Sequence, residues 1–506
     1  MPEPTLTTPY PIRQIAVIGG GMTGLSAAHR LLELQRERSL PLAITLFEAA
    51  SEIGGLMGTR EIDGYRIETG ADSFITNKPW ALQLCHRLGL SSRLIPTDAR
   101  YRRSLILYRG RPVAVPEGFQ LLAPISLGPV LRSPLLSWPG KLRLGAEYFL
   151  PPKRAAAGET LPDESLADFS RRRFGKEALE RIIQPMVGGI YTSDPERLSM
   201  RATMSRFLDL EQKYGSVIRG LRTEQARQAA DSDPTASGAR YGLFVSLQNG
   251  ISDLLSALRD QVTARGQVRT GQRIVGLERS ANGAGWRLSI QTGTTQAGSA
   301  QPPQSAALES AEFDAVVIAL PTHRAAPLIA PICPAAADKL RQFEYASTCI
   351  VVSGHKAADI AHPLDAFGLV IPKIEQRRIL AVSFTHRKFP GRAPADRAIL
   401  RTFVGGAMQP ELARLPDAEI QQLVREELRD ILGVRGEPEV VQVARWMDSM
   451  PQYTVGHVDR VAALRRDMEP LTTLALAGNA YDGVGIPDAV HSGEQNAERI
   501  VQQLFG

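Results

Sequence analysis

The chain has 506 residues, more than a single hydrophobic core usually organises, so we expect two or three domains. Its 43% hydrophobic and 22% charged residues are typical of a globular protein. The net charge of +6 comes from basic residues spread along the sequence instead of gathered with aromatic ones, which argues against a nucleic-acid partner.

The cysteines and histidines exclude several kinds of site. Cys85, Cys333 and Cys349 lie far apart without a CxxC pair, which argues against a disulfide scaffold or a cysteine zinc site and fits a reducing compartment. The histidines form no HxH or HExxH pair, so we predict no metal site. The sequence shows no signal-peptide pattern and no apolar run of the roughly 18 residues that a membrane span needs. We therefore expect a cytoplasmic protein, either soluble or peripheral to a membrane.

The first predicted elements are a buried strand at Ile15–Ile18, a glycine turn and a helix. The turn has the pattern Gly19-x-Gly21-x-x-Gly24. The first glycine permits a tight turn, the second lets the backbone approach a pyrophosphate, and the third lets the helix pack on the strand. The amides and positive dipole end of the helix then face the phosphates. This pattern predicts a dinucleotide-binding unit.

A second strand, Ala43–Phe47, ends at Glu48, about 20 residues beyond the glycine turn. An acid at this position binds ribose hydroxyls and argues against a cofactor with a 2′-phosphate. The glycine pair Gly54–Gly55 and the stretch Gly70–Phe74 follow, and they differ from a plain NAD-binding pattern. They resemble the flavin-binding amine oxidase superfamily, whose FAD extends across this region. Leu56 stands where many members have a basic residue.

A helical, proline-rich stretch is predicted from Trp80 to about Arg206, interrupted by a hairpin that turns at Arg109–Gly110. Within it, Glu117–Leu150 is apolar and also carries basic residues. This composition fits two alternatives equally well: a surface that contacts a membrane or forms a tunnel, or a set of core helices.

Two basic clusters, Arg100–Arg103 and Arg171–Arg173, also have two interpretations. They could contact anionic lipid or an acidic ligand, or they could be exposed charge on a helix or loop. Thr223–Arg240 is polar and predicts a loose surface excursion.

Strands return in the second half of the chain. The pattern predicts strands at Gln272–Arg279, Trp286–Gln291 and Asp314–Ala319, a low-complexity loop at about 291–310, and a second sheet with helices between Ala325 and about Val443.

The end of the chain repeats the pattern of its beginning. A strand at Leu474–Ala477 is followed by a loop with Gly478, Gly483 and Gly485, and then by a helix that begins near Pro487. We predict that this strand joins the first one in a discontinuous domain. The helix would then direct its N-terminal amides at the flavin end of the cofactor.

Three stretches resemble one family more closely than the glycine motifs do. Phe169–Met200, Arg445–His457 and Gly478–Gly493 are similar to the oxygen-dependent protoporphyrinogen and coproporphyrinogen III oxidases of haem biosynthesis. The resemblance implies an α/β fold with three parts. These are a discontinuous Rossmann-like FAD-binding domain (1–82, 244–320 and 445–506), a mixed-sheet substrate domain (211–243 and 321–444) and a helical membrane-binding or lid domain (83–210).

The resemblance also implies where FAD is bound. The positions that match the family's contacts are Gly19, Gly20, Gly21, Met22, Thr23, Gly24, Glu48, Ala49, Gly54, Gly55, Gly70, Ala71, Asp72, Ser73, Ile274, Trp446, Val484, Gly485 and Ile486. No catalytic side chain is singled out, because the cofactor carries out the difficult chemistry in such enzymes.

The implied reaction is the six-electron oxidation of a porphyrinogen to a porphyrin by dioxygen, with release of hydrogen peroxide. Ser104 stands where plant and animal protoporphyrinogen oxidases have an arginine, so we favour coproporphyrinogen III over protoporphyrinogen IX. Coproporphyrinogen has four propionates, and Lys78 and Arg103 are the candidate side chains that bind them.

Other interpretations of the sequence stay open. Another flavin amine oxidase, a carotene desaturase and a flavin-free escort protein would share the fold. As partners we expect the porphyrinogen and dioxygen, with an anionic membrane surface and neighbouring haem-pathway enzymes as further candidates.

Overall fold

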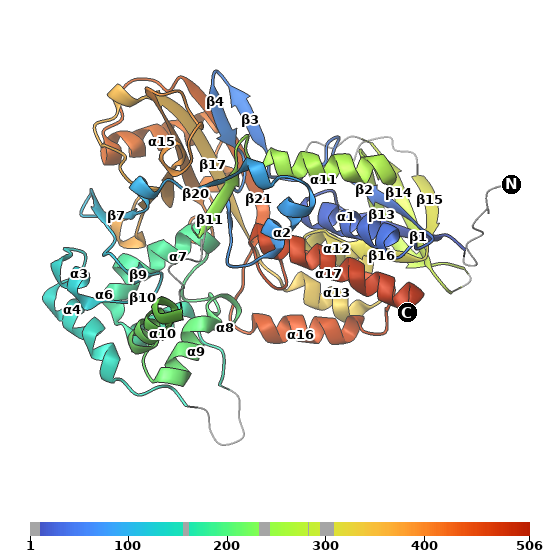
Figure 1. Ribbon diagram of the computed structural model, residues 1–506, viewed down its shortest axis with the longest axis horizontal. Coiled ribbons are helices and arrows are strands. Elements are labelled where there is room, and N and C mark those ends of the chain that lie inside the picture. The colour runs from blue at the N-terminus through green and yellow to red at the C-terminus, as the bar shows by residue number, and fades with distance from the viewer. Residues whose placement is uncertain (1–10, 155–160, 232–242, 282, 294–307) are drawn as a thin grey trace.

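The computed structural model describes residues 11–154, 161–231, 243–281, 283–293 and 308–506. Figure 1 shows an elongated molecule in which a sheet covered by helices lies at one end, and a second sheet and a group of helices share the other. The expected α/β class is confirmed.

A five-stranded parallel sheet holds both ends of the chain. Its order is β12 (Gln267–Arg269), β2 (Leu42–Phe47), β1 (Arg13–Ile18), β16 (Ala315–Ile318) and β22 (Leu474–Leu476). Only β16 separates the first strand from the last, with Ile18 opposite Ile318 and Ile318 opposite Leu476. The carboxyl ends of β1 and β22 therefore lie at the same edge of the sheet.

Both faces of this sheet are buried, which explains why its strands are almost entirely apolar. One face packs against α1 (Met22–Glu37), α11 (Ser252–Arg265) and α17 (Ile486–Phe505). The other packs against α12 (Thr322–Ile329), α13 (Pro334–Arg341), α16 (His457–Met468) and an antiparallel sheet of β13 (Gln272–Arg279), β14 (Trp286–Thr292) and β15 (Leu308–Phe313).

The second large sheet has seven strands. Its order is β21 (Val440–Pro451), β17 (Tyr345–Lys356), β20 (Arg397–Gly405), β19 (Ala381–Phe384), β18 (Gly368–Val370), β7 (Ser104–Tyr108) and β8 (Arg111–Ala114). α15 (Asp417–Leu432) packs on one face. On the other face, the hairpin β3 (Thr59–Ile62) and β4 (Tyr65–Glu68) contributes to a small core with β17 and β20. The hairpin predicted around Arg109–Gly110 is thus β7–β8, and it joins this sheet.

The group of helices at the lower left of Figure 1 packs on the β7 end of the same sheet. It consists of α3 (Leu127–Arg132), α4 (Trp138–Gly145), α5 (Leu166–Arg173), α6 (Lys176–Ala178), α7 (Gln184–Tyr191), α8 (Met200–Thr203), α9 (Ser205–Tyr214) and α10 (Val217–Asp231), with the short strands β9 (Phe119–Gln120) and β10 (Ala123–Pro124).

Two further helices and a small sheet complete the α-helices and strands of the described residues. They are α2 (Trp80–Arg87), α14 (Thr385–Lys388) and a small sheet of β5 (Phe74–Ile75), β11 (Phe244–Leu247) and β6 (Leu94–Pro96). No helix in the described part of the chain is long and apolar enough to cross a membrane.

Two expectations about polar segments need correction. The predicted excursion at Thr223–Arg240 is wrong in its first part, because α10 continues to Asp231; residues 232–242 lie outside the described residues. The low-complexity loop is shorter than predicted, since β14 reaches Thr292 and β15 begins at Leu308. Residues 294–307 lie outside the described residues.

In the basic cluster Arg171–Arg173, two of the three side chains are partly or fully buried in ion pairs. The side chain of Arg173 is 1% exposed and pairs with the fully buried Glu147. Arg172 bridges Glu164 and Glu211. Only Arg171, paired with Glu196, fits the predicted exposed charge.

Candidate functional site

The glycine turn after β1 shows why each glycine is needed. Gly19 has a φ of +108°, and a Cβ there would lie 2.5 Å from the carbonyl oxygen of Ala319. A Cβ on Gly24 would lie 1.8 Å from the carbonyl oxygen of Gly19. A Cβ on Gly21, in contrast, would meet no atom within 4 Å. The first and third glycines are therefore packing positions, while the second faces open space that a cofactor can enter.

The N-terminus of α1 opens onto the same space. Gly21 is its N-cap, in an extended conformation, and no side chain caps the helix. The amides of Met22, Thr23 and Gly24 form the first turn, which carries the positive end of the helix dipole. Backbone amides, open space and the dipole together suit a pyrophosphate.

Glu48 lies where β2 ends and turns back toward the glycine turn. Its Oε2 accepts a hydrogen bond of 2.7 Å from the amide of Gly20, and its Oε1 accepts one of 2.8 Å from the amide of Ala50. Ala49 is the residue between Glu48 and Ala50 in the chain. Glu48 is partly exposed beside the glycine turn, where a carboxylate can accept hydrogen bonds from ribose hydroxyls.

The glycine pair after Glu48 also contacts this turn. The amide of Gly54 donates to the carbonyl oxygen of Gly20 over 2.8 Å, and a Cβ on Gly55 would lie 3.5 Å from the Cα of Gly21. Both glycines have a positive φ. Ile274 lies at a bulge of β13, and its side chain is buried in the core cluster that also contains Phe47. Ile274 can therefore offer a cofactor its backbone but little of its side chain.

The Gly70–Ser73 turn is held by the seven-stranded sheet. The indole nitrogen of Trp446 donates to the carbonyl oxygen of Thr69 over 3.0 Å, and a Cβ on Gly70 would lie 2.6 Å from the indole ring. The predicted contacts Gly70 and Trp446 are thus brought together, whereas the side chain of Ala71 packs against the core of the five-stranded sheet. The carboxylate of Asp72 is buried and turned into the sheet, so only its backbone can face a cofactor.

The C-terminal glycine loop ends at the same edge of the five-stranded sheet. α17 begins at Ile486, one residue before the predicted Pro487, with Gly485 as its N-cap. The amide of Gly485 donates to the carboxylate of Asp488 over 3.3 Å. α17 packs so closely on α1 that a Cβ on Gly493 would lie 2.3 Å from the carbonyl oxygen of Thr23. Val484, Gly485 and Ile486 therefore reach the edge of the sheet where the glycine turn lies.

The two candidate substrate anchors lie in different places. Lys78 precedes α2, and its ammonium group pairs with Asp488 in the first turn of α17 at 2.6 Å. Arg103 precedes β7 and pairs with Asp365, and its Nε also donates to the carbonyl oxygen of that residue over 2.6 Å. Lys78 is thus beside the predicted flavin contacts Val484–Ile486, whereas Arg103 is held by a surface carboxylate.

Sequence reasoning missed two cations at the Gly70–Ser73 turn. Lys388 lies at the end of α14 and Arg401 in the middle of β20, and both pair with Asp72. The run Ala398–Gly405 is apolar apart from Arg401 and Thr402, and a charge within such a run is a signal of a buried ion pair. Lys388 carried no such signal. In the described ranges, His, Cys, Asp and Glu side chains form no group of three that could hold a metal.

Comparison with known proteins agrees with this geometry. The model of the flavin containing amine oxidoreductase family matches residues 22–501. Coproporphyrinogen III oxidase of Bacillus subtilis is 31% identical, over 97% of this chain and 99% of that protein. Protoporphyrinogen oxidase 2 of Arabidopsis thaliana is 27% identical, over 97% and 94%. The crystal structure of an Exiguobacterium sp. 255-15 protein, assigned as a protoporphyrinogen oxidase, has a TM-score of 0.82 at 29% identity and covers 97% and 99%.

The residues at the edge of the five-stranded sheet fit FAD, because they offer an open glycine turn, an uncapped helix N-terminus and a ribose-binding acid side by side. The chain belongs to the flavin-containing amine oxidoreductases, in the family of coproporphyrinogen III and protoporphyrinogen oxidases, and it is an oxidoreductase with FAD as its cofactor.

Proposed function

We propose that the protein oxidises coproporphyrinogen III to coproporphyrin III with dioxygen, releasing hydrogen peroxide. The observation that carries the proposal is its 31% identity to the Bacillus subtilis coproporphyrinogen III oxidase over nearly the whole of both chains. Two further relatives with the same name, from Propionibacterium freudenreichii and Staphylococcus aureus, support it. Protoporphyrinogen IX is the second candidate substrate, supported by the relatives from plants.

When bound, FAD supplies the oxidation of the macrocycle and the reduction of dioxygen. The residues of the chain bind and orient. The glycine turn and α1 would hold the pyrophosphate, and Glu48 the ribose. The Gly70–Ser73 turn, Trp446 and Val484–Ile486 would hold the flavin end. The expected three-domain division of the chain belongs to the same proposal.

The propionates of the substrate need cationic partners. Lys78 suits this role because it is beside the N-terminus of α17 and remains partly exposed despite its pair with Asp488. Arg103 is half exposed, and a propionate would have to replace Asp365 as its partner.

The residues just before β7 add another candidate, Arg102. Leu105 and Leu107 face the core under α15, and Ile106 faces the core of the helices. Arg103 immediately precedes the strand and pairs with Asp365, whereas Arg102 ends the 3-10 turn before it, with φ −71° and ψ 58°, outside the extended strand. Arg102 is exposed, and its guanidinium donates a long hydrogen bond of 3.4 Å to the hydroxyl of Thr97, a neutral partner that a propionate can replace more readily than the carboxylate beside Arg103. We propose Lys78 and Arg102 as the main anchors, with Arg103 as the third candidate.

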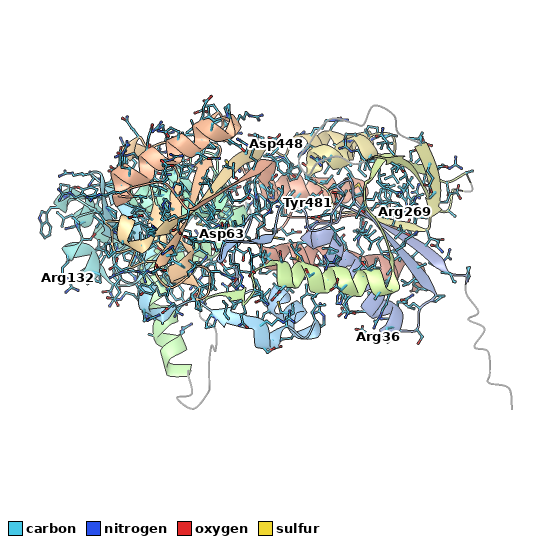
Figure 2. The ribbon with its side chains drawn as sticks, turned by 90° about the horizontal axis from the view of Figure 1, so that it is seen from above. Arg36, Asp63, Arg132, Arg269, Asp448 and Tyr481 are labelled. Carbon is cyan, nitrogen blue, oxygen red and sulfur yellow. The ribbon has the colours of Figure 1, made fainter. Side chains whose placement is uncertain are left out.

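We also propose that the protein is cytoplasmic and that its helices can dock on an anionic membrane or a neighbouring enzyme of the haem pathway. Leu131, Trp138, Leu142 and Phe149 are 48%, 66%, 72% and 84% exposed. Leu135, Leu136 and Leu144 of the same segment are buried. The exposed residues thus favour a membrane-contacting surface, and the buried residues favour core helices, so each interpretation of Glu117–Leu150 is supported by one side of the segment. Figure 2 places Arg132 of α3 at the far end of the molecule from Arg269 of the five-stranded sheet.

Side-by-side turnover of the two porphyrinogens by the purified holoenzyme tests the substrate. We expect a higher kcat/KM for coproporphyrinogen III than for protoporphyrinogen IX, with porphyrin formation measured by its fluorescence. A clear preference for protoporphyrinogen IX would reverse the assignment, and no turnover of either would reject the proposed function.

A further inference from the structure

A buried cluster of charges lies directly beneath the Gly70–Ser73 turn. The carboxylate of Asp72 is 2.9 Å from the ammonium of Lys388 and 3.0 Å from the guanidinium of Arg401, and it accepts a 2.8 Å hydrogen bond from the hydroxyl of Ser73. Burial by itself raises the pKa of Asp72, but the charges of Lys388 and Arg401 outweigh it and hold the pKa below its usual value. The carboxylate is therefore ionised, and the three groups together carry one net positive charge.

The two cations also fix the shape of the turn. Arg401, which is 3% exposed, donates to the carbonyl oxygen of Gly70. Lys388 donates to the hydroxyl of Ser73 over 2.9 Å. Arg401 belongs to the seven-stranded sheet and Lys388 to α14, and both lie more than 300 residues along the chain from the turn. The turn is thus held in place by the second sheet.

A second buried pair, Arg392 and Glu68, lies next to this cluster, and burial raises the pKa of Glu68 to about 7. Arg392 lies 3.8 Å from Glu68, and both side chains are fully buried. Arg392 donates to the hydroxyl of Ser246 over 2.8 Å, and that hydroxyl donates to the carbonyl oxygen of Asp72 over 2.6 Å. Asp72 is consequently fixed through its backbone as well as its carboxylate, so the excess positive charge has a defined position.

We propose that Lys388 and Arg401 are positioning residues for the flavin: through Asp72 they hold the Gly70–Ser73 turn and place one net positive charge beside the cofactor. This inference rests on the proposal that the turn contacts FAD. Reduced flavin carries more negative charge than oxidised flavin, and a fixed charge acts strongly where water is excluded. The cluster therefore favours the reduced state and raises the midpoint potential of the bound flavin.

Charge variants of the holoenzyme test the proposal through the midpoint potential of the flavin and its dissociation constant. Lys388→Gln removes the excess charge and should lower the potential. Asp72→Asn leaves two positive charges and should raise it. The double variant restores one net charge and should return the potential toward the wild-type value. A merely structural role would not produce opposite shifts that cancel. Arg401→Met should weaken FAD binding by about tenfold, and Arg401→Lys should recover part of the loss.

Lys339→Gln is the matched control, because Lys339 forms a partly exposed pair with Asp467 between α13 and α16. It should leave both quantities unchanged. Lys388→Gln decides the question even if Asp72→Asn does not fold, since Lys388 is partly exposed. An unchanged or raised potential in Lys388→Gln would overturn the proposal. None of these measurements uses a porphyrinogen, so their outcome is independent of whether the proposed reaction occurs.

Discussion

At the scale of single residues, Gly21 and Gly24 have the same side chain but different roles. A Cβ on Gly24 would collide with the backbone of Gly19, whereas one on Gly21 would meet no protein atom. The backbone of Gly21, with φ −77° and ψ −177°, is extended and open to any residue. The sequence motif alone predicts that both matter, and the structure separates packing from ligand approach.

We therefore expect Gly21→Val to fold normally and to lose FAD, because its side chain fills the space where the pyrophosphate approaches. Gly24→Val should instead lose the fold. Flavin absorbance after purification measures occupancy, and circular dichroism with thermal unfolding of the apoprotein measures folding. Full occupancy in Gly21→Val would show that the phosphate turn is wrongly assigned.

The substrate anchors give a second prediction for single residues. Lys78→Ala and Arg102→Ala should each raise KM for coproporphyrinogen III by about ten- to a hundredfold, because a charge-assisted hydrogen bond contributes roughly 1.5–3 kcal/mol. The value of kcat should change little if the anchor binds ground and transition states equally.

Arg103→Ala is the matched comparison for these anchors, since it removes the neighbouring arginine, which already pairs with Asp365. It should have the smaller effect. A larger effect in Arg103→Ala than in Arg102→Ala would contradict the choice of Arg102 over Arg103. FAD content must be measured in Lys78→Ala, because Asp488 loses its partner there.

At the scale of secondary-structure elements, the helices around α5 are joined by buried ions. Glu147 accepts a hydrogen bond of 3.0 Å from Arg173 of α5, one of 2.6 Å from Ser216 and one of 2.8 Å from the amide of Val217. It thus caps α10 while neutralising Arg173. Neither group can find water, since both side chains are essentially fully buried.

Removing one partner leaves the other charge buried and unpaired. Arg173→Met should lower the free energy of unfolding by about 3–5 kcal/mol, measured by urea denaturation. The double variant Arg173→Met, Glu147→Leu should be more stable than the sum of the two single variants predicts. Arg171→Met is the control at an exposed pair, where we expect at most about 1 kcal/mol. Equal losses in Arg173→Met and Arg171→Met would contradict the role of burial.

Features encoded by neighbouring residues could be predicted from the sequence, whereas contacts between residues far apart along the chain could not. The glycine turn, β2 with Glu48 and the β7–β8 hairpin were predictable, because each is encoded by a local pattern of glycines or alternating side chains. The contacts of β7 with β18 and of Asp72 with Lys388 and Arg401 were not, because alternation identifies a strand but not its neighbour. The burial of Arg173 was missed for the same reason.

At the scale of the whole molecule, the two ends of the chain build one edge of a sheet. β1 and β22 lie on either side of β16, so the helices that follow them, α1 and α17, begin at the same edge. The repeated strand, glycine loop and helix made this arrangement predictable. The Gly70–Ser73 turn, however, is also held by Trp446 and Arg401 of the second sheet and by Lys388 of α14. The proposed FAD site thus draws on both large sheets.

The exposed apolar face of α3, α4 and the residues after α4 gives a prediction for the molecule as a body. The double variant Trp138→Ser, Leu142→Ser should reduce flotation with anionic liposomes, and high salt should weaken wild-type binding. Leu308→Ser, at an equally exposed leucine of β15, should have no effect. Salt-independent binding, or equal loss in all variants, would contradict docking through this face.

The proposed reaction is the oxidation of a porphyrinogen by dioxygen in the FAD-loaded protein. The most direct measurement is the amount of dioxygen consumed for each coproporphyrin III formed by the purified, FAD-loaded protein. A six-electron oxidation with hydrogen peroxide as product requires about three dioxygen molecules per porphyrin. We expect this ratio with the wild-type protein, and neither oxygen uptake nor porphyrin above the non-enzymatic background with Gly21→Val. A wild-type protein that binds FAD fully but forms porphyrin no faster than Gly21→Val would contradict the account.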